Sequence, residues 1–289
     1  MNGMGVPIVT PFDGDDRVDH VGLRTLVTWL ESTGVDFLVP CGSTGEAPLL
    51  SANERRRVVE TVADAATVPV LAGTGREGFE PALAATEAAD AAGADAALVL
   101  TPSYYDPDQS TLASYYRDLA DESPIPLYLY SVPVYTDVVL DPETVATLAD
   151  HDAIAGIKDS SGNVARLQRA VRLTADASFD VLVGNGAVPA SGLDVGVDGA
   201  ILALAHVVPE LAVELARCHA DGDVHAAASI QADLAPLNRA MVGAYGAPGV
   251  KAGLELRGQP GGEPRRPLRP VDDAARETIR SHLERLDVV

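Results

Sequence analysis

The sequence predicts a (β/α)8 TIM barrel followed by a C-terminal helical appendage. Three observations predict this α/β fold. Eight short apolar, strand-like runs follow one another, most are separated by ten or more residues at helical spacing, and three similar glycine-containing junctions each precede an apolar run. Alternating strands and helices imply parallel strands joined by right-handed crossovers. A doubly wound open sheet is the alternative architecture.

The expected elements can be placed along the chain in order. The eight strands are expected at residues 6–10, 37–41, 69–73, 96–101, 126–132, 154–160, 180–184 and 199–205. Helical spacing between them is clearest at residues 51–66, 79–92, 109–122 and 164–174. The junctions are Gly34-Val35-Asp36, Gly93-Ala94-Asp95 and Gly196-Val197-Asp198. Because glycine can take the left-handed conformation that ends a helix, these junctions indicate a repeated βα unit.

The strand signal stops after about residue 206. Helical spacing continues at residues 209–220, 224–241, 250–257 and 271–286, interrupted by a loop at 258–269 that is rich in glycine and proline. We therefore expect a catalytic barrel domain over residues 1–222 and a C-terminal helical region over residues 223–289. The chemistry of such a barrel lies at the C-terminal ends of its strands.

Composition excludes several classes of protein. The 42 acidic and 21 basic residues give a formal charge of −21, spread through periodic segments, which indicates salt adaptation and disfavours nucleic acid and anionic membranes as partners. No apolar run approaches the roughly 18 residues of a membrane span, and no secretory signal is recognisable at the N-terminus. Two cysteines are too few for a disulfide framework. We expect a cytoplasmic protein.

Lysine is scarce, and one of the two lysines lies in a strand. The chain has only Lys158 and Lys251 against nineteen arginines, and Lys158 sits in the apolar run 154–160. A desolvated lysine can lose its proton and attack a carbonyl, whereas arginine stays protonated. Strand alternation points Lys158 into the barrel, with Tyr130 near the barrel mouth on the preceding strand, so we expect imine chemistry in which the phenol relays protons. For Lys251, a solvated or helix-capping charge is the stronger interpretation.

The loop Cys41-Gly42-Ser43-Thr44-Gly45-Glu46 follows the second expected strand. Its glycines allow backbone amides to approach a ligand, its hydroxyls add donors, and a carboxylate would be a natural guest. The alternative is a plain turn with a helix cap.

Four motifs together resemble the dihydrodipicolinate synthase and N-acetylneuraminate lyase superfamily. They are residues 42–46, the pair Tyr104-Tyr105, residues 130–133 and residues 156–162, in that order and spacing. The resemblance implies a (β/α)8 barrel with C-terminal helices, a homotetramer built from two dimers, and a lysine Schiff base with a 2-oxo acid.

Position by position, the resemblance implies that Lys158 forms the imine with pyruvate and that Tyr130 relays its protons. Gly42, Ser43 and Thr44 would hold the carboxylate, and Thr44 would hydrogen-bond Tyr130. Tyr105 of a neighbouring subunit would complete the relay, with Tyr104 as the alternative. Tyr135 and Gly186 complete the expected substrate-binding set. No metal or organic cofactor is expected, because the protonated imine is the electron sink.

One position favours a subfamily. Dihydrodipicolinate synthases carry an arginine for the aspartate semialdehyde carboxylate where this chain has Tyr135. This departure favours a class I aldolase that cleaves a 2-keto-3-deoxy sugar acid, such as 2-keto-3-deoxygluconate or its 6-phosphate, to pyruvate and an aldehyde. The alternatives are 4-hydroxy-tetrahydrodipicolinate synthase, a 2-keto-3-deoxy sugar acid dehydratase and a sialic acid lyase.

Other classes are disfavoured by the same sequence. Residues 73–78 spell a dinucleotide-binding string, but no acidic residue ends the next expected strand, so a nicotinamide oxidoreductase is not favoured. The six histidines are scattered without zinc-like spacing, which disfavours a metal-dependent aldolase; His206 is expected to be structural. Lys158, Tyr130 and Thr44 argue against a noncatalytic sugar-acid-binding module.

Overall fold

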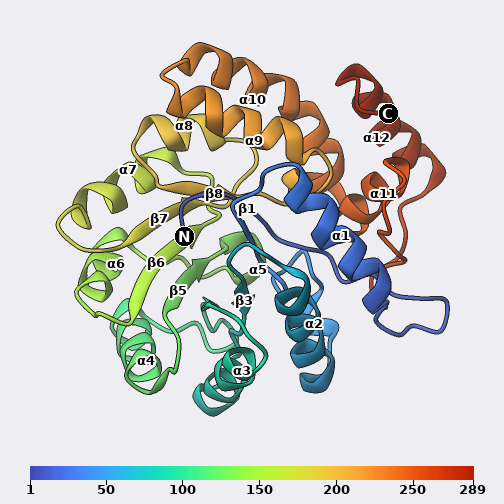
Figure 1. Ribbon diagram of the computed structural model, residues 1–289. Helices are drawn as coiled ribbons and strands as arrows, with labels where there is room; N and C mark the ends of the chain where they lie inside the picture. The colour runs from blue at the N-terminus through green and yellow to red at the C-terminus, as the bar shows by residue number, and fades with distance from the viewer.

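Eight parallel strands form the centre of the computed structural model, which describes residues 1–289 (Figure 1). The strands are β1 (Gly3–Val6), β2 (Phe37–Leu38), β3 (Leu71–Gly73), β4 (Ala96–Leu100), β5 (Leu127–Ser131), β6 (Ile154–Asp159), β7 (Asp180–Val183) and β8 (Gly199–Ile201). They pair in the order β2-β1-β8-β7-β6-β5-β4-β3. A parallel bridge between Leu38 and Val70 links the two ends of this order. The predicted barrel is therefore confirmed, and the open sheet is excluded.

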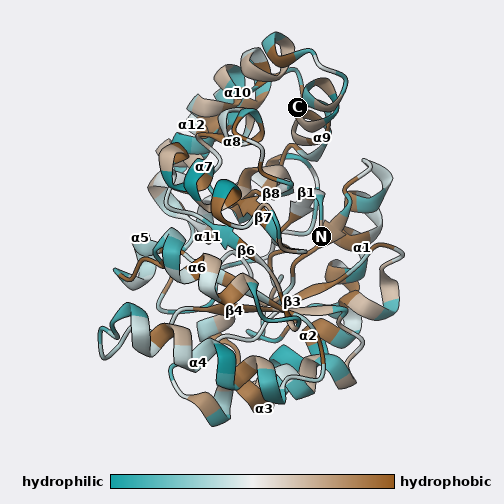
Figure 2. Cartoon of the chain, turned by 90° about the vertical axis from the view of Figure 1, so that its left-hand side faces the viewer, coloured by the Kyte–Doolittle hydropathy of each residue, from teal (hydrophilic) through white to brown (hydrophobic).

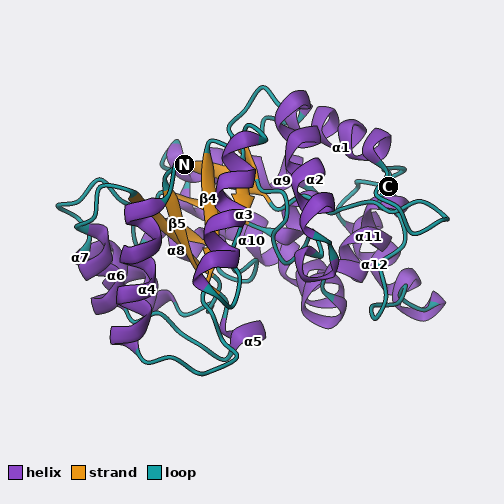
Figure 3. Ribbon diagram, turned by 90° about the horizontal axis from the view of Figure 1, so that it is seen from below, coloured by secondary structure: helices purple, strands orange, loops and turns teal.

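Helices surround the barrel and cover its strands (Figure 3). In the βα units they are α1 (His20–Ser32), α2 (Ala52–Ala65), α3 (Phe79–Ala91), α4 (Gln109–Glu122), α5 (Pro133–Thr136), α6 (Pro142–Ala149), α7 (Val164–Leu173) and α8 (Pro189–Asp194), with a short 3-10 helix η1 (Ala47–Leu49) before α2. Ser51 caps α2 in a capping box: its hydroxyl accepts a hydrogen bond from Glu54 N, and the Glu54 carboxylate accepts one from Ser51 N. The strands are largely apolar, while polar residues gather on the outer helices (Figure 2).

Both the glycine and the aspartate of the repeated Gly-x-Asp junctions have a structural role. The three glycines have φ values of 87°, 91° and 95°, the left-handed conformation expected after a helix. Each aspartate accepts a hydrogen bond from the backbone of a neighbouring strand or its approach: Asp36 from Met4 N (2.6 Å), Asp95 from Val70 N (2.8 Å) and Asp198 from Val181 N (2.8 Å). Each junction thus ends one helix and supplies a hydrogen-bond acceptor to a backbone N–H group at or near the start of an adjacent strand.

The first and eighth strands differ most from their predicted bounds. The first strand is Gly3–Val6 rather than residues 6–10, because Gly3, Met4 and Gly5 pair with β8 despite the low strand propensity of glycine. A side chain at Gly5 would collide with the ring of Phe37, with a Cβ only 2.2 Å from Cε2. The eighth strand stops at Ile201, and the chain then forms a 3-10 helix, η2 (Ala203–His206).

The chain after residue 206 is helical, as predicted. It contains α9 (Pro209–Ala220), α10 (Val224–Asn238), a π-helical turn η3 (Arg239–Gly243), α11 (Ala247–Leu256) and α12 (Asp273–Arg285), with residues 258–269 outside regular structure. The expected domain boundary at 222 falls in the turn between α9 and α10, and α10 packs against α8 and α9. The division into two domains stays a prediction. None of the helices has both the length and the apolar character that a membrane crossing requires.

Candidate active site

Lys158 lies near the C-terminal end of β6 with its side chain inside the barrel. Its residue exposure is 5%, and the pairing of β5 with β6 places Tyr130 directly beside it. The Lys158 Nζ lies 4.4 Å from the centroid of the Tyr130 ring. Asp159 points to the other face of the strand and accepts a bond from Ser161 N (2.7 Å) instead. The amine is therefore buried against a phenol rather than paired with the adjacent carboxylate.

Gly184, at the end of β7, makes room for this lysine. A Cβ added at Gly184 would lie 2.9 Å from Cε and 3.1 Å from Cγ of Lys158, and 2.0 Å from Oγ of Ser160. Any side chain here would displace the amine from its position. Sequence reasoning missed this residue, because nothing local distinguishes it from the many other glycines at strand ends.

The loop after β2 presents unpaired amides. The backbone N–H groups of Ser43 and Thr44 donate to no acceptor in the chain, whereas Gly45 N and Glu46 N bond back to Gly42 O and Ser43 O at 3.1 Å. Gly45 O accepts from the buried hydroxyl of Thr10 (2.7 Å), which anchors the loop to the segment after β1. Two free donors on a fixed loop suit a carboxylate.

A cavity of about 250 Å³ opens beside this loop. Gly42, Ser43 and Tyr130 lie on its wall, together with residues from the ends of β3 and β4. Thr44 is not part of the wall, and the expected hydrogen bond between Thr44 and Tyr130 is not formed. Ser43 is the hydroxyl residue of the loop that shares the cavity with the phenol.

The remaining candidate residues lie farther out. Tyr104 and Tyr105 are 79% and 86% exposed and pack edge to face with ring centroids 5.0 Å apart. Tyr135 is 64% exposed. Gly186 has a packing reason to be glycine, because a Cβ there would lie 2.5 Å from Oδ1 of Asn238. Tyr128 is buried and donates its hydroxyl hydrogen to Asp180.

The interpretation of Lys251 as a solvated or capping charge is wrong. Lys251 lies in α11 with 1% exposure, and its Nζ is 2.5 Å from Oε1 of Glu46, itself 2% exposed. The Nζ also donates to Glu263 O (2.9 Å) and lies 4.4 Å from the ring centroid of Phe12. Burial lowers the pKa of Lys251, and the Glu46 charge opposes that shift. The last residue of the 42–46 loop is therefore held by an ion pair from the C-terminal region.

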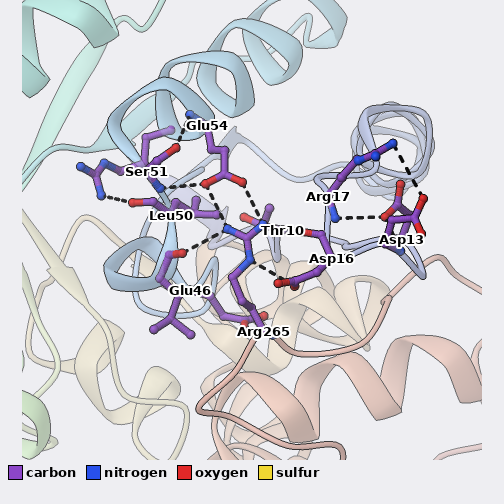
Figure 4. Close-up of polar contacts among 12 residues, drawn as sticks. Thr10, Asp13, Asp16, Arg17, Glu46, Leu50, Ser51, Glu54 and Arg265 are labelled. Carbon is purple, nitrogen blue, oxygen red and sulfur yellow. Dashed lines mark hydrogen bonds and ion pairs between the residues drawn. The ribbon is translucent and has the colours of Figure 1, made fainter.

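Arg265 makes a second connection from the C-terminal loop to the same region (Figure 4). Its backbone N donates to Oε2 of Glu46 (2.8 Å), and its guanidinium binds both carboxylate oxygens of Glu54 at 2.8 and 3.0 Å. The hydrogen bond from Arg265 is the main cause that lowers the pKa of Glu54 to about 2. Both partners come from segments more than 200 residues apart, so no local pattern in the sequence could have indicated them.

His206 is structural in position, as expected. It is fully buried, neither ring nitrogen has a hydrogen-bond partner, and burial lowers its pKa to about 3. The ring is therefore neutral at ordinary pH.

A buried lysine beside a tyrosine, at the C-terminal ends of barrel strands and next to a loop with free amides, defines a (β/α)8 enzyme equipped for carbonyl chemistry. The chain belongs to the dihydrodipicolinate synthetase family, whose profile matches residues 1–286. Members of this family are pyruvate-dependent lyases, and this protein is an enzyme of that class.

Similar proteins cover nearly the whole chain. A 4-hydroxy-tetrahydrodipicolinate synthase of Methanothrix thermoacetophila is 39% identical over 284 residues, which are 98% of this chain and 96% of that protein. A DapA-like lyase of Halobacterium salinarum is 38% identical and covers 100% of this chain and 95% of its own length. The structure of the chloride-inhibited dihydrodipicolinate synthase of Acinetobacter baumannii with pyruvate superposes with a TM-score of 0.95 at 32% identity, covering 100% of this chain and 99% of that one.

The prediction of a 2-keto-3-deoxy sugar acid aldolase is wrong. Curated relatives 34–39% identical over 96–98% of this chain are named 4-hydroxy-tetrahydrodipicolinate synthase, which was the alternative. The aldolase hypothesis rested on Tyr135 alone. Because a carboxylate can be bound by a cation from another loop, one substituted position does not determine the second substrate.

Proposed function

We propose that this enzyme is a 4-hydroxy-tetrahydrodipicolinate synthase, which condenses pyruvate with aspartate semialdehyde. The observation that carries the proposal is the buried Lys158 amine 4.4 Å from the Tyr130 ring centroid, in a chain whose full-length relatives carry that name. The amine supplies the nucleophile, and the unpaired Ser43 and Thr44 amides suit the pyruvate carboxylate.

The first stage is imine formation. The neutral Lys158 Nζ attacks C2 of pyruvate, and the carbinolamine loses water to give a protonated imine. Tyr130 donates a proton to the leaving hydroxyl group, which departs as water. The resulting phenolate then takes a proton from C3 as the imine becomes an enamine. The positive imine nitrogen accepts the electron pair released at C3, so this step proceeds without a further electron sink.

The second stage forms the carbon–carbon bond. The nucleophilic C3 of the enamine attacks the aldehyde carbon of aspartate semialdehyde, and the aldehyde oxygen takes a proton to become the 4-hydroxyl group. The substrate's amino group then attacks the imine carbon and displaces Lys158. One pyruvate and one aspartate semialdehyde give one cyclic product and one water, and the enzyme amine is regenerated.

A coupled assay with purified enzyme tests this function. We expect sustained consumption of pyruvate together with aspartate semialdehyde. Mass spectrometry should detect the formation of 4-hydroxy-tetrahydrodipicolinate. N-acetylneuraminate and 2-keto-3-deoxygluconate serve as control substrates for cleavage. Cleavage of either control at a higher kcat/KM than the condensation would refute the proposal.

We also propose that the enzyme assembles as a homotetramer of two dimers and that Tyr105 enters a neighbouring subunit's relay. The support is the high exposure of the Tyr104 and Tyr105 rings, since apolar surface of this kind is commonly covered in an assembly. The cytoplasm is the proposed location, because Cys41 and Cys218 are both free. The excess of acidic residues supports salt adaptation.

Tyr105→Phe and Tyr104→Phe distinguish the two candidates for the relay. We expect Tyr105→Phe to lower kcat by roughly 10²-fold or more, as for loss of a proton-relay group, while Tyr104→Phe changes it less than about threefold. Steady-state kinetics of both variants measures this difference. The phenylalanine rings preserve the apolar contact, so analytical ultracentrifugation should show an unchanged assembly. The assignment is reversed if Tyr104→Phe shows the larger loss.

A further inference from the structure

The cavity beside the 42–46 loop carries positive charge that the proposed chemistry at Lys158 does not use. Besides Ser43 and Tyr130, its wall includes two arginines, Arg55 from α2 and Arg76 from the loop after β3. Arg55 donates to the carbonyls of Ala47 (3.2 Å) and Leu50 (2.5 Å), and Arg76 donates to the carbonyl of its own neighbour, Gly75. No carboxylate lies within 4.0 Å of either guanidinium, although the chain has 42 acidic residues and exposed arginines such as Arg56 and Arg217 have acidic partners.

The surroundings of both guanidinium groups destabilise their positive charge. Burial, with a smaller contribution from the charge of Arg55, lowers the pKa of Arg76 to about 10. Burial also lowers the pKa of Arg55. A negative ligand between them would offset both the desolvation and the repulsion.

One neutral group of the wall also lacks a partner. Thr101 is 1% exposed, and its Oγ1 has no hydrogen-bond partner although it is buried on the cavity wall. A buried hydroxyl without a partner indicates a site for a ligand or water. Cys41, on the same wall, has a pKa raised to about 12 by burial, so its thiol is neutral and does not neutralise the arginines.

Glu77 is the single carboxylate on the wall, and it is engaged elsewhere. Its Oε2 accepts from the backbone N of Ser103 and of Tyr104, both at 2.9 Å, and its Oε1 accepts from the Ser103 hydroxyl at 3.2 Å. Glu77 therefore holds the loop after β4 and leaves Arg76 free for an external anion.

We propose that Arg76, supported by the charge of Arg55 and the hydroxyl of Thr101, binds the carboxylate of the aldehyde substrate. This inference rests on the proposed function, in which that substrate carries a carboxylate. Tyr135 cannot supply the cation for this carboxylate, because its side chain is a phenol and is 64% exposed. The guanidinium of Arg76 has most of its donors unused and can bind a carboxylate through two parallel hydrogen bonds.

Arg76→Gln tests the proposal through the two Michaelis constants. We expect the KM for aspartate semialdehyde to rise roughly 10- to 100-fold, as for loss of a charged hydrogen bond, while the KM for pyruvate and the borohydride-trapped pyruvate adduct stay within about twofold. Arg76→Lys keeps the charge but not the two-pronged geometry, and should give a smaller rise. Arg57→Gln, an exposed arginine of α2, removes the same charge and should change neither constant.

The possible failures are distinguishable. If the wild-type enzyme makes product and Arg76→Gln leaves the aldehyde KM unchanged, or raises both KM values equally, the carboxylate subsite is wrong and the synthase function stands. A wild-type enzyme that traps pyruvate but does not condense it with aspartate semialdehyde refutes the function and the subsite together. If circular dichroism shows that Arg76→Gln does not fold, Arg76→Lys and Thr101→Val test the proposal in its place. An unchanged KM for the aldehyde in both of these variants overturns the assignment.

Discussion

Lys158→Arg is expected to abolish turnover, with kcat falling by roughly 10⁴-fold or more, because the variant loses the covalent step altogether. Arginine has a similar length, but it stays protonated and cannot form the imine. The direct readout is borohydride reduction in the presence of pyruvate, followed by peptide mapping. In the wild-type enzyme the adduct should map to Lys158 alone, and Lys158→Arg should yield none.

The second lysine is an internal control for this experiment. Lys251 is 1% exposed and paired with Glu46, so it should remain unmodified in both proteins. An adduct on Lys251, or steady turnover by Lys158→Arg, would show that the imine assignment is mistaken. Lys158→Met, which has no basic group at this position, should behave as Lys158→Arg does.

Lys251→Met is expected to lower the free energy of unfolding by about 3–5 kcal/mol, because it leaves the Glu46 carboxylate charged, buried and without its cation. Glu46 ends the loop that presents the Ser43 and Thr44 amides, so the KM for pyruvate should rise in the same variant. Chemical denaturation at constant salt measures the first effect, and steady-state kinetics measures the second.

Two control variants distinguish the effect of losing this buried ion pair from the effect of losing a positive charge in general. Arg217→Met removes an exposed cation paired with Glu214 and should lower the free energy of unfolding far less than Lys251→Met does. Adding Glu46→Gln to Lys251→Met removes the orphaned charge and should recover part of the lost stability. A loss for Lys251→Met no larger than that of Arg217→Met would mean that the buried pair contributes little.

Much of the architecture was predictable because its causes are local. Strand alternation needs only a few residues, so it correctly pointed Lys158 and Tyr130 into the barrel. The Gly-x-Asp junctions were recognisable because glycine is suited to the left-handed backbone in which they occur. The first strand was misplaced for the same reason: local propensity disfavours Gly3 and Gly5, and only their pairing with β8 makes them a strand.

By itself, the sequence determined the repeated βα units, the inward-facing lysine and its tyrosine neighbour, since periodicity and burial act over short stretches of chain. Only the tertiary structure decided which groups share an enclosure: the Lys251–Glu46 pair, the space left by Gly184 for the amine, and the two arginines that line a cavity with Ser43. These contacts join segments that are far apart in the chain. Their energies depend on distance and desolvation in the folded molecule, which no local pattern of residues encodes.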